Sequence, residues 1–225
     1  FNMYSLLIDV VSNNSMILVW SQKNNKLVGK SIFSTEKNSS EVIISKIEAL
    51  LNKYYIDYNQ IEKIVAVIGP GNYTNIRVGI SAAKGIGIAL DIPTFGITQH
   101  ELVAKTYKTN LSSNLGVLVH AKNEDFYFQK FNNGISLDEI KVVGFQDILN
   151  EVIEEKLCVI ETGKDFLSLL LKNNKNFGNL KSNHIMSISS IGIIFKDLDK
   201  NTNKNLPKYI KDPNAEKYKK ENIYI

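Results

Sequence analysis

The 225 residues are 44% hydrophobic and 22% charged, a balance that is ordinary for a soluble globular protein of one or two domains. The apolar runs stop short of the roughly 18 residues that a membrane span needs, so the sequence predicts no membrane segment and a cytoplasmic protein. A single cysteine, Cys158, excludes an internal disulfide and a cysteine-rich metal motif. The net charge of +4 comes from lysines scattered among asparagines, which indicates a solvated surface and not a shaped nucleic-acid groove.

The first half of the chain predicts a meander of strands followed by alternating helices and strands. Three short β-type runs are separated by turn residues, and the next segment repeats its apolar residues every three and four positions, as a helix does. Thr98 and Glu101 then form a capping box that opens a further helix. The predicted elements are strands at 4–11, 15–21 and 26–34, a helix that Ser39 or Ser40 caps and that runs to Tyr54, a strand at 63–69, a helix at 74–90, a strand at 93–97 and a helix from 98 onward.

The second half repeats this order in a shortened form. Strands at 115–121, 125–131 and 139–144 precede a helix at 145–155, a strand at 157–162 and a helix at 164–173. Two tandem βββαβα units are typical of the duplicated, ribonuclease-H-like α/β architecture of actin, sugar kinases and heat-shock ATPases, the ASKHA proteins.

The break between the two units predicts the subdomains. We expect an N-terminal subdomain over residues 3–108, where the polar turn segment KTNLSSN begins, and a smaller C-terminal subdomain over 109–206. A polar connector then leads to a tail over 207–225, which we expect to pack back on the N-terminal subdomain.

The segment IGPGNYTNIRVGISAAKGIGIAL, residues 68–90, fits either a phosphate-binding loop or a protein-binding helix. Gly69 and Gly71 let the backbone come close to a ligand, and Thr74 can cap a helix whose first amides point toward the loop. A dinucleotide-binding motif, however, has a glycine or alanine where Thr74 stands, and Pro70 removes one of the amides that would bind a phosphate. The segment therefore carries half of a phosphate-binding motif.

The helix predicted at 74–90 carries a stripe of small residues. Gly79, Ala83 and Gly87 recur every four positions and make one face smooth. Two glycines within a helix cost roughly 1 kcal/mol each relative to alanine, so packing or function should supply a reason for them. The stripe either packs against the protein's own sheet or lets another helix come close. Arg77, the single arginine of the chain, suits an ion pair with a carboxylate on a neighbouring element.

Candidate catalytic and metal-binding residues are few. Asp9 ends the first strand, but the loop after it lacks the glycine and threonine that wrap a phosphate, so we expect a turn or capping role. His100, His120 and His184 are too far apart in the sequence to indicate a local zinc site. The sequence thus predicts no catalytic residue, no metal and no cofactor.

Residues 69–104, GPGNYTNIRVGISAAKGIGIALDIPTFGITQHELVA, resemble the signature of the TsaB (YeaZ) family, which is close to GPGSFTGLRIG followed by a small-residue helix. Weaker similarity runs through LLIDVVSNN, VHAKNEDFYFQKF and LPKYIKDPNA and so extends over nearly the whole chain. The matching residues are Gly69, Pro70, Gly71, Thr74, Arg77, Gly79, Ala83, Lys84, Gly85 and Pro93, with Tyr73 in place of a phenylalanine. The chain departs from the family pattern at Asn72, Asn75, Val10, Val11 and His120.

The resemblance implies an actin-like fold and a role in forming threonylcarbamoyladenosine beside the tRNA anticodon. It also implies a non-catalytic protein that pairs with TsaD, which transfers the threonylcarbamoyl group, and that works with the ATPase TsaE, with tRNA contacted at most indirectly. We expect the helices at 40–55 and 74–90 to form the face that binds TsaD, or a second copy of this chain when TsaD is absent. The expected partner-binding residues are Ile43, Ile47, Gly69, Pro70, Gly71, Tyr73, Thr74, Arg77, Gly79, Ala83 and Gly87.

Two enzymatic alternatives remain open on the sequence alone. An ATPase or phosphotransferase of the same fold would use Asp9 and the Gly69 to Thr74 loop, and tight ATP binding that Asp9→Ala abolishes would identify it. A peptidase is the second alternative, but the chain lacks paired histidines at a metal-binding spacing.

Overall fold

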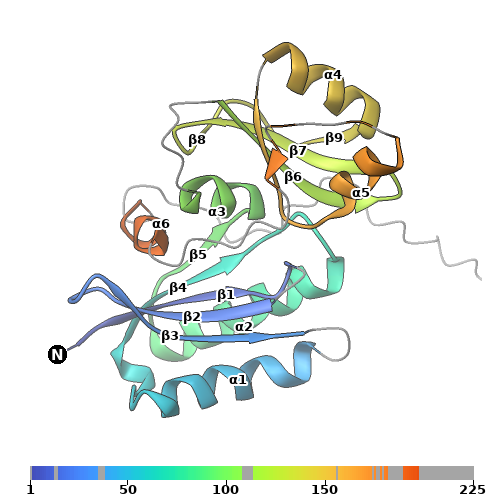
Figure 1. Ribbon diagram of the computed structural model, residues 1–225. Coiled ribbons are helices and arrows are strands. Elements are labelled where there is room, and N and C mark those ends of the chain that lie inside the picture. The colour runs from blue at the N-terminus through green and yellow to red at the C-terminus, as the bar shows by residue number, and fades with distance from the viewer. Residues whose placement is uncertain are drawn as a thin grey trace, which may run out of the picture.

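Two β-sheets, one from each half of the chain, organise the structure (Figure 1). The computed structural model describes residues 2–12, 15–34, 39–107, 114–155, 157–173, 175, 178, 180–181 and 190–197. The first sheet contains β1 (Tyr4–Asp9), β2 (Ser15–Ser21), β3 (Lys26–Phe33), β4 (Ile61–Val67) and β5 (Thr94–Ile97). The second contains β6 (Asn114–Lys122), β7 (Asp125–Asn132), β8 (Ile135–Ser136), β9 (Lys141–Gly144), β10 (Cys158–Glu161) and β11 (Leu180–Lys181).

The two sheets share one pairing pattern. In the first, with the order β3-β2-β1-β4-β5, the meander strands pair antiparallel and β1-β4-β5 pair parallel. In the second, β9-β7-β6-β10-β11 repeats the same order and the same strand directions, and β8 also pairs with β7. Antiparallel neighbours need only short turns, whereas the parallel neighbours are joined through helices. The predicted duplication of a βββαβα unit is therefore confirmed.

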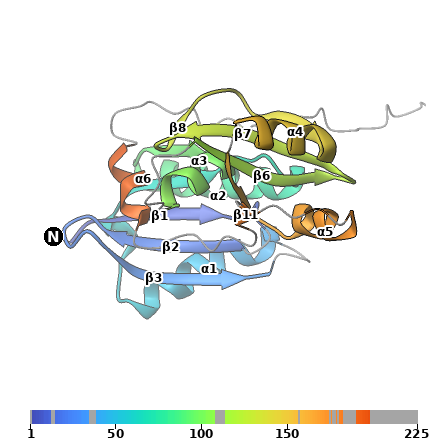
Figure 2. The ribbon, with the colours of Figure 1, turned by 45° about the horizontal axis from the view of Figure 1, so that its top comes forward.

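In the described part of the chain, six α-helices cover the sheets. Of these, α3 lies between the two sheets (Figures 1 and 2). In the first sheet, Leu6 and Ile8 of β1 face α1 and α2, whereas Leu7 faces α3 and α6, as the alternation of strand side chains requires. On the second sheet α4 and α5 pack on one face, and Val103 and Ala104 of α3 pack on the other. The helices are α1 (Ser39–Lys53), α2 (Tyr73–Leu90), α3 (Gln99–Thr106), α4 (Phe145–Glu155), α5 (Asp165–Lys172) and α6 (Ile191–Asp197).

The last described helix returns to the first sheet. Ile191, Ile194 and Phe195 of α6 join the buried cluster around Trp20, and a side chain at Gly192 would overlap the indole ring. The predicted boundary between subdomain and tail is therefore corrected, because the chain packs on the first half from residue 191 and not from residue 207. The expected tail at 207–225 lies outside the described residues. The sequence reasoning also missed the short helix at Tyr58–Gln60 and the two-residue strands β8 and β11.

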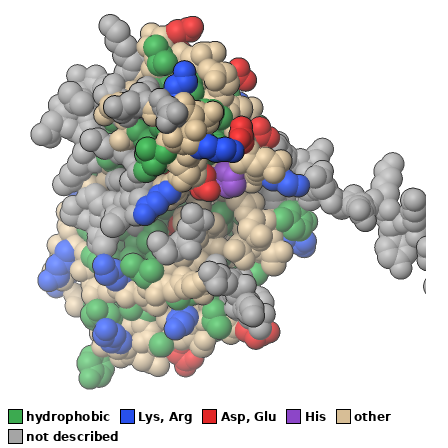
Figure 3. Space-filling view, turned by 45° about the vertical axis from the view of Figure 1, so that its right-hand side comes forward, with side chains coloured by type: hydrophobic (Ala, Val, Ile, Leu, Met, Phe, Trp, Pro, Cys, Tyr) green, Lys and Arg blue, Asp and Glu red, His purple; other side chains and the backbone are tan. Residues whose placement is uncertain are grey.

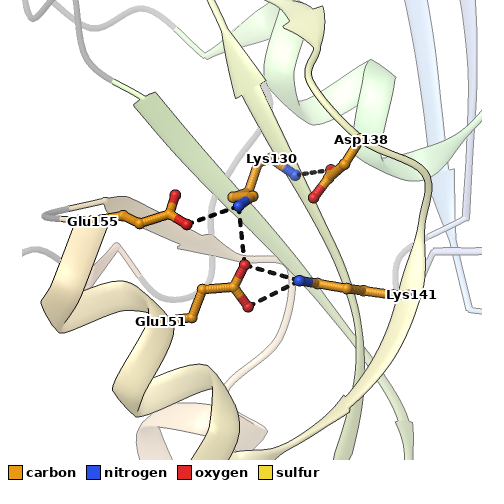
Figure 4. A network of polar contacts seen from close by, with 5 residues as sticks. All are labelled: Lys130, Asp138, Lys141, Glu151 and Glu155. Atoms are coloured by element: carbon orange, nitrogen blue, oxygen red, sulfur yellow. Dashed lines mark hydrogen bonds and ion pairs between the residues drawn. The ribbon is translucent and has the colours of Figure 1, made fainter.

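A network of ion pairs fixes α4 on the second sheet (Figure 4). Glu151 of α4 accepts from Lys130 of β7 at 3.1 Å and from Lys141 of β9 at 2.8 Å, and Glu155 binds Lys130 at 2.9 Å. The backbone N–H of Lys130 also donates to Asp138 at 2.8 Å. Burial raises the pKa of Glu151, but the hydrogen bonds and charges of the two lysines outweigh it and hold that pKa below its ordinary value.

We expect Glu151→Gln to lower the free energy of unfolding by about 1–2 kcal/mol at neutral pH, because two lysines lose their shared carboxylate. Since the folded pKa of Glu151 is depressed, its contribution is present above the ordinary glutamate pKa and is lost as the pH falls through the folded value. Glu155→Gln is the control, because the Glu155 side chain is 41% exposed and should contribute less than about 1 kcal/mol. Urea denaturation at neutral and strongly acidic pH measures both variants; an equal loss for Glu151→Gln at the two pH values would contradict the assignment.

Candidate functional site

The loop before α2 is a compact turn whose polar groups are used within the chain. Asn72 is the N-cap of α2: its side chain accepts from the Asn75 N–H at 3.1 Å, so the helix begins at Tyr73 and the predicted Thr74 cap is corrected. Gly69 has φ = 111°, which glycine adopts at the least cost. A Cβ on Gly71 would lie 2.5 Å from Cγ1 of Val11. The two glycines thus serve the turn and its packing against the loop after β1.

The small-residue stripe of α2 faces the protein's own sheet. Gly79, Ala83 and Gly87 are all buried. A Cβ on Gly79 would lie 2.9 Å from Cγ2 of Val10, and one on Gly87 would overlap Cγ2 of Thr94 and lie 3.2 Å from the Ile92 carbonyl oxygen. The stripe therefore lets α2 approach the first sheet closely, and the expectation that it contacts a partner is corrected.

Gly69 and three other expected partner-binding positions are also buried within the chain. Ile43 and Ile47 of α1 are 2% and 0% exposed and belong to the core under the first sheet, and Pro70 is buried in the turn. These residues position the two helices, and the surface available to another protein is formed by their neighbours.

The opposite face of α2 forms an open groove with α1. Its volume is about 620 Å³, and small or apolar side chains line most of it. Ile44 is 46% exposed and Tyr73 is 41% exposed. Apart from the residues next to Gly85 and the backbone of α2 itself, no described atom lies within 4 Å of the place where a Cβ of Gly85 would stand. An exposed apolar surface of this kind is typical of a site that another molecule covers. We call it the α1–α2 groove; its lining residues are Ile43, Ile44, Tyr73, Thr74, Arg77, Val78, Ser81, Ala82, Gly85, Ile86 and Ala89.

Arg77 lies in this groove and contacts an aromatic ring instead of an acid. Its Nη1 donates to the Tyr73 hydroxyl at 3.0 Å, and its guanidinium carbon stands 5.2 Å from the centre of the Tyr73 ring. Within the described ranges, no carboxylate lies within ion-pair distance of the guanidinium. The expected ion pair with a neighbouring element is thus corrected to a contact within α2. More widely, on the face in Figure 3 the described basic side chains are dispersed and do not form one patch.

Asp9 is buried at the end of β1, and its own loop uses its carboxylate. Oδ1 accepts from the N–H of Val11 at 2.9 Å and of Ser12 at 3.0 Å, Oδ2 accepts from the Ser12 hydroxyl, and Gln99 donates to that hydroxyl at 2.8 Å. Burial raises the pKa of Asp9 more than these hydrogen bonds lower it. The predicted turn or capping role is confirmed.

Glu161, at the end of β10 in the second half, is a second buried carboxylate and was not anticipated. It is buried and accepts from the N–H groups of Phe166 at 2.6 Å and Leu167 at 3.2 Å, at the start of α5. Helix N-termini attract anions, and in this protein a carboxylate of the chain itself occupies that place. Burial is the main cause that raises its pKa. The signal in the sequence was an acidic residue that ends a buried strand shortly before a helix.

The two histidines that the structure describes contact different backbone carbonyl groups. His100 on α3 is fully buried, its Nε2 lies 3.1 Å from the Tyr127 carbonyl oxygen of β7, and burial lowers its pKa to about 4. His120 lies 2.9 Å from the Asn123 carbonyl oxygen, and His184 is outside the described residues. Among the residues that the structure describes, no three His, Cys, Asp or Glu side chains are grouped closely enough to hold a metal ion. None of the helices described is long and apolar enough to span a membrane.

Comparison with solved structures identifies the fold. YeaZ from Pseudomonas aeruginosa superposes with a TM-score of 0.73 at 12% identity, covering 92% of this chain and 99% of that one. The inorganic polyphosphate/ATP-glucomannokinase of Arthrobacter sp. strain KM superposes with a TM-score of 0.53 at 8% identity, covering 89% and 100%. Together with the repeated strand order, these similarities establish the duplicated actin-like fold.

Comparison of the sequence with known proteins identifies the family. A family model described as "TsaD: tRNA N6-adenosine threonylcarbamoyltransferase" matches residues 31–217. The tRNA threonylcarbamoyladenosine biosynthesis protein TsaB of Buchnera aphidicola subsp. Acyrthosiphon pisum is 25% identical over 211 residues, which cover 90% of this chain and 93% of the relative. TsaB of Escherichia coli is 21% identical over 155 residues, which cover 67% and 66%. The chain therefore belongs to the tRNA N6-adenosine threonylcarbamoyltransferase (TsaD) family, and within it to the TsaB (YeaZ) group of proteins of threonylcarbamoyladenosine biosynthesis.

Proposed function

We propose that this chain is a non-catalytic partner of TsaD in forming threonylcarbamoyladenosine beside the tRNA anticodon. It acts in the cytoplasm by binding TsaD through the α1–α2 groove, and TsaE is the ATPase of the same assembly. When TsaD is absent, a second copy of this chain covers the same groove. The observation that carries this proposal is the open apolar groove on a helix whose opposite face is fully packed against the first sheet.

The groove fits a protein helix better than a small polar ligand. It follows α2, which at 18 residues is about 27 Å long, and small residues leave room along much of that length. A neighbouring helix can pack its side-chain ridges into such a surface. Burying the apolar lining stabilises the complex by roughly 25 cal/mol for each Å² removed from water.

The positions that a nucleotide-using enzyme of this fold would need are occupied by the chain's own groups. Asp9 binds its own loop, and Asn72 caps α2. A nucleotide that used Asp9 would have to take its buried carboxylate away from these hydrogen bonds, and the N–H groups of the loop would be left without an acceptor. This supports the non-catalytic assignment over the ATPase or phosphotransferase alternative, although the family bears an enzyme's name.

Calorimetric titration with the TsaD of the same organism and with Mg²⁺ and ATP tests the proposal. We expect a one-to-one complex with TsaD and no saturable heat with ATP for the chain alone. Asp9→Asn is the control, because asparagine fits the same loop and lies outside the groove; it should bind TsaD as the wild type does. Tight ATP binding that Asp9→Asn abolishes, without binding to TsaD, would contradict the proposal and favour the enzymatic alternative.

A further inference from the structure

Arg77 differs in its chemistry from the rest of the groove. It is the only charged residue among the described residues that line the groove, it is exposed, and α2 contains no acidic residue to neutralise it. It also lies near the N-terminus of α2, where the helix dipole disfavours a positive charge. The described part of the chain offers no structural reason for a positive charge at this electrostatically unfavourable position within an apolar surface.

The guanidinium is held in place but keeps most of its donors. One N–H donates to the Tyr73 hydroxyl at 3.0 Å, while the ring supports the guanidinium plane at 5.2 Å. An arginine has five N–H donors in a planar fork, which matches a carboxylate in a bidentate arrangement. When a partner covers the groove, those donors lose water and require an acceptor from the partner, since an uncompensated buried charge opposes binding.

We propose that Arg77, positioned by Tyr73, pairs with an aspartate or glutamate on the TsaD helix that binds in the α1–α2 groove. This inference rests on the proposed function and deepens it by naming the chemistry of the partner. The partner helix is apolar along the groove and carries its carboxylate beside the start of α2, where the helix dipole adds to the attraction. The pair fixes the register and direction of the helix, and it excludes apolar helices that lack the acid.

Titration of TsaD with charge variants of the whole chain tests this pairing. We expect Arg77→Glu to weaken TsaD binding at least about 100-fold and Arg77→Lys about 10-fold, because lysine lacks the planar fork. Lys84→Glu is the matched control: it makes the same charge change on an exposed position of α2 outside the groove, and it should cost less than about 3-fold. Far-UV circular dichroism of each variant confirms that the fold is retained.

Charge reversal in the partner identifies the acid. Each aspartate and glutamate on the surface helices of TsaD is changed in turn to arginine, and one of these variants should restore binding to Arg77→Glu by at least about 10-fold. If Arg77→Glu bound TsaD with the affinity of the wild type, this inference would be wrong, whereas the proposed function would stand. Loss of tRNA affinity with unchanged TsaD affinity would also overturn it, because the anion would then be a phosphate. Failure of the wild-type chain to bind TsaD would instead overturn the proposed function, and this inference with it.

Discussion

Gly85→Trp should reduce the affinity for TsaD at least about 100-fold without destabilising the chain. Apart from α2 itself, no described part of the chain lies within 4 Å of a Cβ at Gly85, so an indole there projects into the α1–α2 groove and fills the space that the partner helix needs. Replacing a glycine in a helix also favours the folded state by roughly 0.5–1 kcal/mol.

Two measurements separate binding from folding for this variant. Calorimetric titration gives the affinity for TsaD, and thermal unfolding gives the stability; we expect the first to fall and the second to stay level or rise. An unchanged affinity would show that the partner binds elsewhere. A cooperative loss of stability would show that the groove is not open in solution.

Gly87→Leu should lower the free energy of unfolding by about 3 kcal/mol or more. The position is only two residues from Gly85, yet its new Cβ would overlap Cγ2 of Thr94 and lie 3.2 Å from the Ile92 carbonyl oxygen. Because backbone atoms and a β-branched side chain cannot swing away, α2 would have to move off the first sheet and expose part of its core.

Gly85→Leu is the matched control for this prediction, because the same residue enters the same helix on its open side. Urea denaturation should show a lower midpoint for Gly87→Leu and an unchanged or higher midpoint for Gly85→Leu. Equal midpoints would contradict the assignment of the inner and outer faces of α2.

The sequence predicts those strands and helices whose buried apolar residues recur with the period of the element. The strands of the two meanders and the helices α1, α2, α4 and α5 alternate or repeat their apolar residues over enough positions to be recognised. By contrast, β11 has two residues and depends on β10 for its pairing. The short helix α6 has apolar residues at the right spacing, but its position depends on Trp20, which is far away in the sequence.

For the candidate site, the sequence shows a small-residue stripe on α2 but does not show which face of this helix packs against the sheet. Both faces of α2 carry small residues, so size alone could not decide which of them meets the sheet. The distinguishing signal was Ile76 and Ile80, which share an arc of the helix with Gly79 and Ala83 and are buried with them. The Tyr73–Arg77 contact joins residues four apart on one helix, a spacing at which side chains meet, whereas the position of acids relative to Arg77 depends on the fold.

Reconstituted threonylcarbamoyl transfer to tRNA tests directly whether this chain is a non-catalytic partner that acts through the α1–α2 groove. The TsaD and TsaE of the same organism are supplied with a threonylcarbamoyl donor and tRNA, and the wild-type chain, Gly85→Trp, Asp9→Asn or no chain is added. We expect transfer that requires this chain, is lost with Gly85→Trp and is kept with Asp9→Asn. Transfer by this chain without TsaD, or an equal rate with Gly85→Trp, would contradict a non-catalytic partner that acts through the α1–α2 groove.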